Sequence, residues 1–394
     1  MSEKTPCHFD VAVIGGGAAG LMCAIEAGNR GRSVILLERA EKIGKKILIS
    51  GGGRCNFTNV NAAPDRYISS NPHFVRSALS RYLPTDFLAL VKKHKIAWHE
   101  KKLGQLFCDQ SSRQIVAMLQ AEANAAGVEI QVKCDIQAVE KSDDFFRLRT
   151  SREELRASSV VVACGGLSIP KMGATAFGHQ LARQFGLRLV DHRPGLVPLT
   201  LPQKQLANFR PLSGVSIDAN VSFEKTAFRE NILFTHRGLS GPAILQISSY
   251  WKPGKPIAID LLPDLSDEFI LREIRSGMKT GNWLAQHLPR RFVDVWLDPK
   301  IADRPGAQLS RKELEKLHQN IRRWEVFPNG TEGYAKAEVT IGGVDTRDLS
   351  GKTMEAREVP GLFFIGEAVD VTGWLGGYNF QWAWASGWVA GQFV

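Results

Sequence analysis

The chain has 394 residues, of which 44% are hydrophobic and 23% are charged, so it can form two or three domains and does not have the composition of a disordered chain. Its formal net charge of +10 suits a polyanionic partner such as RNA, although many enzymes are mildly basic for solubility alone. No apolar run reaches the roughly 18 residues of a membrane-spanning helix, and the polar start lacks the apolar region of a signal peptide, so we expect a soluble, cytoplasmic protein that does not bind membranes.

The first predicted elements are a strand, a helix and a second strand. Residues 9–14 (FDVAVI) have the pattern of a buried parallel strand. A helix extends from the glycines that follow to Arg30, and Gly31 ends it. Residues 33–37 form the second strand. This β-α-β order predicts the beginning of a Rossmann-type domain.

The turn between the first strand and the helix carries the pattern GxGxxG. Gly15 would make the tight turn, Gly17 would let the backbone approach a pyrophosphate, and Gly20 would let the helix pack on the strand. Glu38 follows at close to the spacing of about 20 residues expected of the acid that binds ribose hydroxyls. The residues of this unit that we expect to contact a dinucleotide are Gly15, Gly17, Ala18, Ala19, Gly20, Glu38 and Arg39.

A second glycine-rich segment, GGGRCNFTN at residues 51–59, favours FAD over NAD. An ordinary turn does not need three glycines together with Arg, Asn and Thr, whereas a backbone that wraps closely around a cofactor does. The contacts expected from this region are Lys46, Gly53, Arg54, Cys55, Asn56 and Thr58.

Two later strands are predicted to return to the same sheet. Residues 159–163 precede one glycine pair, and residues 361–365 precede an acid that would bind the ribityl chain. A terminal helix follows, with Asn379 as its predicted N-cap and its dipole directed at the flavin pyrimidine, although an ordinary terminal helix packed on the sheet has the same pattern. The contacts expected here are Gly165, Gly166, Gly366, Glu367, Gly377, Tyr378 and Asn379.

The middle of the chain has a different pattern. Residues 196–262 alternate in short segments broken by Pro and Gly, which indicates antiparallel β-structure. Residues 266–324 have helical periodicity and many Arg and Lys residues, a candidate RNA-binding face that includes Arg290, Arg291, Arg322 and Arg323. Because no second GxGxxG precedes another β-α-β unit, either NAD(P)H docks transiently at the flavin as electron donor or another donor reduces it.

Four segments together resemble the YhiN/BaiN-like flavoprotein family, and the resemblance covers nearly the whole chain. They are residues 51–59, 234–245, 337–346 and 366–387. Other branches commonly carry a cysteine where this chain has Leu375, which fits the YhiN-like branch and removes any catalytic role for that cysteine.

The resemblance implies an α/β fold with three parts. These are a Rossmann-type FAD-binding domain at 1–195 and 345–394, an antiparallel β-barrel-like substrate domain at 196–263 and 326–344, and a helical insert at 264–325. It further implies reduction of carbon–carbon double bonds. The YhiN-like branch is implied to make dihydrouridine in large-subunit (23S) ribosomal RNA, and another branch is implied to act on steroid-like substrates.

Reduction of a uracil C5=C6 bond requires a hydride from flavin N5 to C6 and a proton to C5. The acid must be protonated near neutral pH, which suits Cys, Tyr or His. Cys55 is the first candidate, although it is equally compatible with a small residue that fills space beside the cofactor. Tyr378 and His236 follow. Trp374 and Tyr378 are candidates to stack on an unstacked uridine, whereas Trp382 fits core packing.

Two other functions remain open. A reductase of a small unsaturated metabolite would have a closed apolar pocket and little salt dependence, and a non-catalytic flavin-containing RNA-binding protein would bind without turnover. The six cysteines form no CxxC pair, so we expect reduced thiols and no metal site. RNA rather than DNA is the expected partner, and the sequence leaves the oligomeric state open.

Overall fold

The structure is a computed structural model that describes residues 7–275 and 277–394, so the polar start of the chain lies outside the described residues. The chain divides into two compact units, which we call the first unit (Met1–Arg193 and Val339–Val394) and the second unit (Pro194–Glu338). The first unit includes β19 (Val339–Val344), which pairs with β11 (Leu189–Gly195). Residues 339–344 are instead expected, from the sequence, in the inserted domain.

A seven-stranded sheet forms the centre of the first unit. In it β1 (Cys7–Ile14) lies between β2 (Val34–Glu38) and β10 (Glu154–Val162), and all three run parallel. β20 (Leu362–Phe364), from near the end of the chain, pairs in parallel with β10. The predicted Rossmann-type sheet built from both ends of the chain is therefore confirmed. The remaining strands are β7 (Glu129–Val132), parallel to β2, and β9 (Phe146–Thr150) and β8 (Ile136–Lys141), which continue antiparallel from β10.

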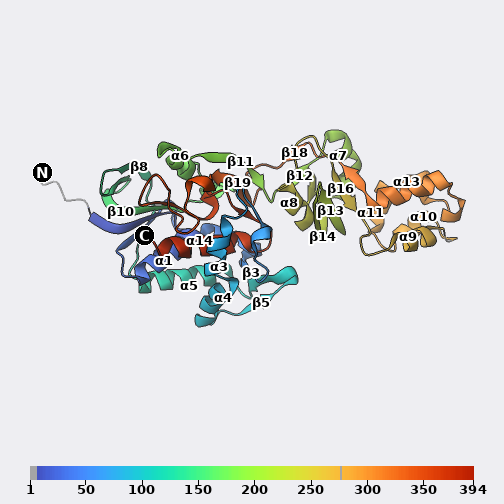
Figure 1. Ribbon diagram of the computed structural model, residues 1–394. Coiled ribbons are helices and arrows are strands. Elements are labelled where there is room, and N and C mark those ends of the chain that lie inside the picture. Colours follow the sequence, from blue (N-terminus) through green and yellow to red (C-terminus); the bar gives the residue numbers. More distant parts are fainter. Residues whose placement is uncertain (1–6, 276) are drawn as a thin grey trace. The chain divides into compact units, whose positions relative to one another are not determined.

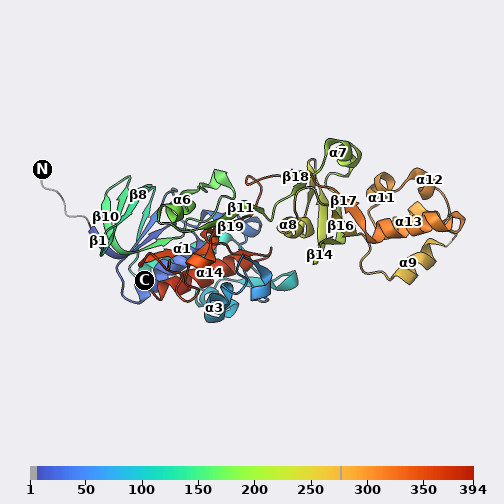
Figure 2. The same cartoon turned by 45° about the horizontal axis from the view of Figure 1, so that its top comes forward.

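Helices α1 (Ala18–Asn29) and α14 (Tyr378–Gly391) lie side by side in the first unit (Figures 1 and 2). A Cβ atom on Gly387 would come within 2.4 Å of the Ala19 carbonyl oxygen. The small residues of α14 therefore allow the two helix backbones to approach closely.

The start of α14 differs from the prediction. The helix begins at Tyr378, and Gly377, with φ 96°, stands in the N-cap position. Asn379 therefore is not the N-cap. Its Oδ1 accepts a hydrogen bond from the Gly373 N–H at 2.8 Å, and its Nδ2 donates to the Gly373 carbonyl at 2.9 Å. The side chain stabilises the loop before the helix instead of the helix end.

Shorter elements complete the first unit. Strands β3, β6 and β5 form a small antiparallel sheet, and β4 pairs with β21. Their bounds are α2 (Lys45–Ile49), β3 (Asn56–Asn59), β4 (Tyr67–Ile68), α3 (Val75–Arg81), α4 (Pro84–Lys93), β5 (Trp98–Glu100), β6 (Gln105–Cys108), α5 (Ser112–Ala125), α6 (Phe177–Gln184) and β21 (Thr372–Gly373).

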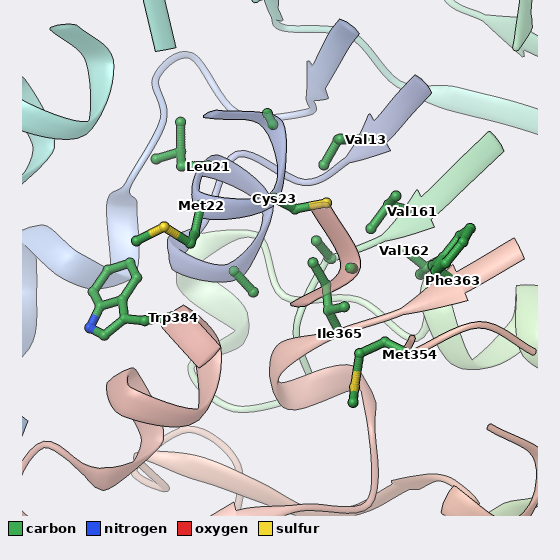
Figure 3. Close-up of a cluster of buried hydrophobic side chains, with 14 of the residues drawn as sticks. Val13, Leu21, Met22, Cys23, Val161, Val162, Met354, Phe363, Ile365 and Trp384 are labelled. Carbon is green, nitrogen blue, oxygen red and sulfur yellow. The ribbon is translucent and has the colours of Figure 1, made fainter. Parts of the chain in front are cut away.

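The core of the first unit lies between the sheet and these helices (Figure 3). Val13 of β1 and Val161 of β10 are fully buried, as are Cys23 of α1 and Trp384 of α14. Cys23 is therefore a core-packing residue. No helix of the described residues has the length and apolarity to cross a membrane.

The second unit contains an antiparallel sheet whose strand order is β17-β16-β13-β14-β15-β12-β18. Its strands are β12 (Leu199–Thr200), β13 (Ser216–Phe223), β14 (Thr226–Phe234), β15 (Gly238–Ser240), β16 (Ile257–Asp260), β17 (Trp324–Val326) and β18 (Gly330–Thr331). Between β16 and β17 lie α9 (Asp267–Ile274), α10 (Thr280–Leu284), α11 (Arg290–Trp296), α12 (Pro299–Ala302) and α13 (Arg311–Arg322). Two further helices are α7 (Gln203–Phe209) and α8 (Pro242–Ser248), and α8 packs on β13 and β14.

Candidate active site

The three glycines of the turn between β1 and α1 have different surroundings. Gly15 has φ 114°, and a Cβ atom there would lie 2.6 Å from the Ala163 carbonyl oxygen. A Cβ atom on Gly20 would lie 2.0 Å from the Gly15 carbonyl oxygen, so the turn and the helix are in direct contact. A Cβ atom on Gly17 would meet no atom within 4 Å. Gly15 and Gly20 therefore allow close packing, whereas Gly17 leaves the backbone open to a ligand.

Open backbone recurs on the neighbouring loops. A Cβ atom on Gly52, Gly53 or Gly165 would also have no atom within 4 Å. Gly165 follows β10, which runs parallel to β1, so its loop and the β1–α1 turn lie at the same edge of the sheet. Among the described residues no side chain caps α1, which leaves the N–H groups of its first turn, including those of Ala18 and Ala19, to face an anion. These features fit a dinucleotide such as FAD.

Glu38 fixes the turn to the second strand. One carboxylate oxygen accepts a hydrogen bond from the Gly16 N–H at 2.7 Å, and the other accepts from the Ala40 N–H at 2.7 Å. Each oxygen retains a further lone pair that a ribose hydroxyl could use. The adjacent Arg39 is exposed and forms an ion pair with Asp135 at 2.8 Å.

Lys46 and Glu367 form a polar cluster with Ser168 and Thr340. Lys46 Nζ lies 2.6 Å from one Glu367 oxygen and donates to Ser168 Oγ at 2.7 Å. The other Glu367 oxygen accepts from Ser168 Oγ at 2.9 Å and from the Thr340 N–H at 2.9 Å. Burial alone would raise the pKa of Glu367, but Lys46 and these donors outweigh it and hold the pKa below its usual value. The carboxylate therefore stays ionised.

The glycine-rich loop is joined to the start of α14. Thr58, which is fully buried, donates to Gln381 Oε1 at 2.6 Å, and Asn59 Nδ2 donates to the Gly376 carbonyl at 2.8 Å. A Cβ atom on Gly377 would lie 2.4 Å from the Thr58 carbonyl oxygen. The Thr58 hydroxyl thus holds the loop against the helix.

Gly366 is fixed to α14 in a similar way. Its N–H donates to Ser386 Oγ, and its carbonyl accepts from Trp382 Nε1, both at 3.0 Å. Trp382 is 1% exposed, which confirms its predicted place in the core.

Cys55 lies beneath the glycine-rich loop and not on its surface. It is fully buried with φ 50°, and burial raises the pKa of its thiol to about 12. The hydroxyl of Ser50 and the thiol of Cys108 are its polar neighbours. By contrast, Arg54 next to it is exposed. The thiol is protonated, but it faces the interior.

Tyr378 belongs to an aromatic cluster at the start of α14. Its ring packs edge-on against Tyr67 and Trp374, with centroid distances of 6.2 and 6.4 Å. The Arg66 guanidinium lies 4.5 Å from the centroid of the Trp374 ring. Burial raises the pKa of Tyr378, and the nearby Arg66 opposes that rise in part.

Two predicted residues belong to the second unit. His236 is exposed in the turn between β14 and β15 and belongs to the second unit, so the geometry of the first unit does not include it. Arg322, expected on an RNA-binding face, is bound within the second unit. Its side chain is 19% exposed and donates to the Leu262 carbonyl at 2.8 Å and to Asp267 at 2.6 Å.

Sequence reasoning missed Ser168, Thr340 and Arg66. Thr340 Oγ1 accepts hydrogen bonds from the Leu167 and Ser168 N–H groups at 2.7 and 3.1 Å, so it shapes the loop that carries the predicted glycines. Its signal was its position inside the segment at 337–346. No comparable signal marked Arg66, whose neighbour Trp374 is far away in the sequence.

Comparison with known proteins places this site in context. The model of a family described as HI0933-like protein Rossmann domain matches residues 9–393. A curated protein of Escherichia coli (strain K12), "Ribosomal RNA dihydrouridine synthase", is 51% identical over 390 residues, which cover 98% of each chain. A protein of Haemophilus influenzae with the same name is 46% identical over 385 residues, which cover 95% of each chain.

A solved structure also has a similar fold. The 3-ketosteroid-Δ4-(5α)-dehydrogenase of Rhodococcus jostii RHA1 aligns with a TM-score of 0.50 and 14% sequence identity, covering 98% of each chain. At this identity the likeness concerns the fold alone.

Proposed function

This chain belongs to the HI0933-like Rossmann family, and we propose that it is an FAD-dependent oxidoreductase that reduces a uridine of large-subunit (23S) ribosomal RNA to dihydrouridine. The observation that carries this proposal is the sequence identity of 51% and 46%, over nearly the full length, to two proteins named ribosomal RNA dihydrouridine synthase. The open glycine loops support the flavin part of the proposal, and the net charge of +10 suits an RNA substrate.

The first unit offers groups for each part of FAD. The first turn of α1 would bind the pyrophosphate, and Glu38 would bind the adenosine ribose. The ion pair of Lys46 and Glu367 would bind the ribityl and flavin end. FAD bound there and reduced would supply the hydride to C6, and an acid of the protein would supply the proton to C5.

Tyr378 is the proton donor that this geometry favours among the three candidates. Its raised pKa keeps the phenol protonated at neutral pH, and Arg66 would stabilise the phenolate left after proton transfer. Cys55 is also protonated, but its side chain has no exposed surface. His236 lies in the second unit.

Recognition of RNA would use the half-buried Trp374. A uridine in folded RNA must leave its stack to be reduced, and an aromatic ring can offset the lost stacking. Arg66 over the Trp374 ring adds a positive charge that can pair with a phosphate. The Arg322 guanidinium, by contrast, is occupied by partners within the second unit.

A single-turnover experiment tests the proposed reaction. The purified protein would be reduced without oxygen and mixed with ribosomal RNA that lacks dihydrouridine. Flavin absorbance and the dihydrouridine content of the RNA would be followed together. We expect one dihydrouridine for each flavin reoxidised.

The same experiment separates the two alternative functions. RNA binding without reoxidation, with naked RNA and with ribosomal precursors alike, would indicate a non-catalytic RNA-binding flavoprotein. Reoxidation only by a small enone, independent of salt, would indicate a metabolite reductase. Either outcome contradicts the proposed reaction. NAD(P)H is our proposed electron donor, and anaerobic flavin reduction by NADH or NADPH tests it.

A further inference from the structure

The first unit contains a cavity of about 490 Å³ that the FAD assignment does not use. One side is formed by residues 71–77, at the start of α3, and the other by the segment that follows β19. Its lining includes His73, Phe74, Thr346, Arg347, Leu349 and Arg357. None of the residues that we assign to FAD lines it. The volume is within the range of about 300–1,000 Å³ typical of small-molecule sites.

The charges around this cavity favour an anion. No carboxylate is among the lining residues, whereas two arginines are. Arg347 is held by Asp345, which is 2% exposed and accepts from Arg347 Nε at 3.0 Å. Arg357 is exposed, and within the described part of the chain its side chain forms no ion pair or hydrogen bond. One guanidinium is therefore fixed in place, and the other remains to pair with a ligand.

A buried hydroxyl group supplies a second, independent indication. Thr346 is 1% exposed, and its Oγ1 has no hydrogen-bond partner among the described residues. Most buried polar side-chain atoms have such a partner, so an unpaired hydroxyl that lines a cavity suggests a donor reserved for a ligand. Thr346 is also the last residue of the 337–346 segment.

The remaining lining adds apolar surface. Phe74 packs edge-on against Trp382, which fixes its ring at the wall of the cavity. A free inorganic ion would not need such contacts, whereas a phosphate attached to a base or sugar would use them.

We propose that this cavity binds a phosphate group of a nucleotide. Arg357 and the Thr346 hydroxyl would bind the phosphate oxygens, and Phe74 would contact the attached group. Two ligands share this chemistry. One is a nicotinamide dinucleotide that reduces the flavin, and the other is RNA, through its phosphate backbone. The binding site is the same for both.

Binding to the oxidised, FAD-loaded protein tests this proposal by calorimetry without turnover. The probes are NAD⁺, NADP⁺, inorganic phosphate and a single-stranded uridine oligonucleotide. The variants are Arg357→Ala and Thr346→Val, with Arg149→Ala as the matched control, because Arg149 is an exposed arginine of β9 that does not line the cavity. Thr346→Val removes an unpaired hydroxyl without changing the side-chain shape, so it should not impair folding.

We expect Arg357→Ala to weaken binding of a nucleotide probe about tenfold and Thr346→Val to weaken it about threefold, with Arg149→Ala unchanged. Loss confined to NAD⁺ or NADP⁺ identifies the dinucleotide, and loss confined to the oligonucleotide identifies RNA. Unchanged affinity for every nucleotide probe in both variants overturns the proposal. Weaker binding of inorganic phosphate alone in the variants overturns it as well. Because binding is measured without turnover, failure here would leave the proposed reaction untouched.

Discussion

The Thr58 hydroxyl donates a hydrogen bond to Gln381 Oε1 at 2.6 Å, and both side chains are fully buried. Gln381 in turn donates to the Tyr82 carbonyl at 2.9 Å. Thr58 lies in the glycine-rich loop and Gln381 in α14, so this contact joins two segments from opposite ends of the chain. Both of these segments are predicted to contact FAD. This buried pair therefore helps to fix their relative position, together with the hydrogen bond from Trp384 Nε1 to the Phe57 carbonyl at 2.7 Å.

Thr58→Val should destabilise the first unit and weaken its hold on FAD. The valine has the same shape but leaves Gln381 Oε1 buried without a donor, which costs about 1–3 kcal/mol. Urea denaturation, monitored by tryptophan fluorescence, measures the decrease in the free energy of unfolding. Thr58→Ser keeps the hydroxyl and is the matched control. Equal stability of the valine variant and the native protein would show that the hydrogen bond does not hold the loop.

Lys46→Met should lower FAD affinity about tenfold or more, because it leaves the Glu367 carboxylate without its cation. In the native protein the pKa of Glu367 lies below its usual value, so its contribution is lost only when the pH falls through that lowered pKa. Without Lys46, burial raises the pKa and the loss begins at higher pH. Flavin retained after gel filtration between pH 5 and 8 measures both effects.

Lys45→Met is the control for this prediction. Lys45 lies 3.6 Å from Glu41, whose side chain is half exposed, and such a partly exposed ion pair contributes little. Equal FAD retention by the two variants at every pH would contradict the role assigned to Lys46.

His179 should make the stability of the first unit depend on pH. Its ring lies against that of His192, with the ring centroids 4.1 Å apart, and burial together with the charge of His192 lowers the pKa of His179 from 6.5 to about 4. The unfolded chain therefore binds the proton first, and stability falls as the pH decreases from about 6.5 to about 4, by about 3 kcal/mol in total. His179→Leu should flatten this slope in urea titrations at several pH values. His236→Gln is the control, because His236 is exposed. An unaltered slope in His179→Leu would show that His179 does not cause the pH dependence of stability.

Local patterns in the sequence predicted the parts of the fold that depend on near neighbours. The β1–α1–β2 unit was predicted because buried parallel strands and tight glycine turns have strong local signatures. The return of β20 to the same sheet also followed from its apolar run. Asn379 was misjudged as an N-cap because Gly377 adopts a left-handed conformation and moves the helix start, while the Asn379 amide binds Gly373 instead.

The polar contacts of the candidate site could not be predicted in this way. The partner of Thr58 is Gln381, and no local pattern joins them. Arg322 was expected to face RNA because its charge is visible in the sequence, whereas its internal acceptors are not. Cys55 was the first candidate for the acid because of its place in the glycine loop, but the sequence gives no indication of which way its thiol points.

Tyr378→Phe tests the proposed proton donor directly. Removing only the hydroxyl should slow flavin reoxidation by RNA about 100-fold or more, the typical contribution of a general acid. FAD content and RNA affinity should stay unchanged, because the ring still packs against Tyr67 and Trp374. Cys55→Ala is the comparison, since a buried thiol that does not donate the proton can be removed without a comparable loss of rate. If Cys55→Ala abolishes dihydrouridine formation in single turnover while Tyr378→Phe does not, the proton comes from the thiol, and the loop above it must open during the reaction.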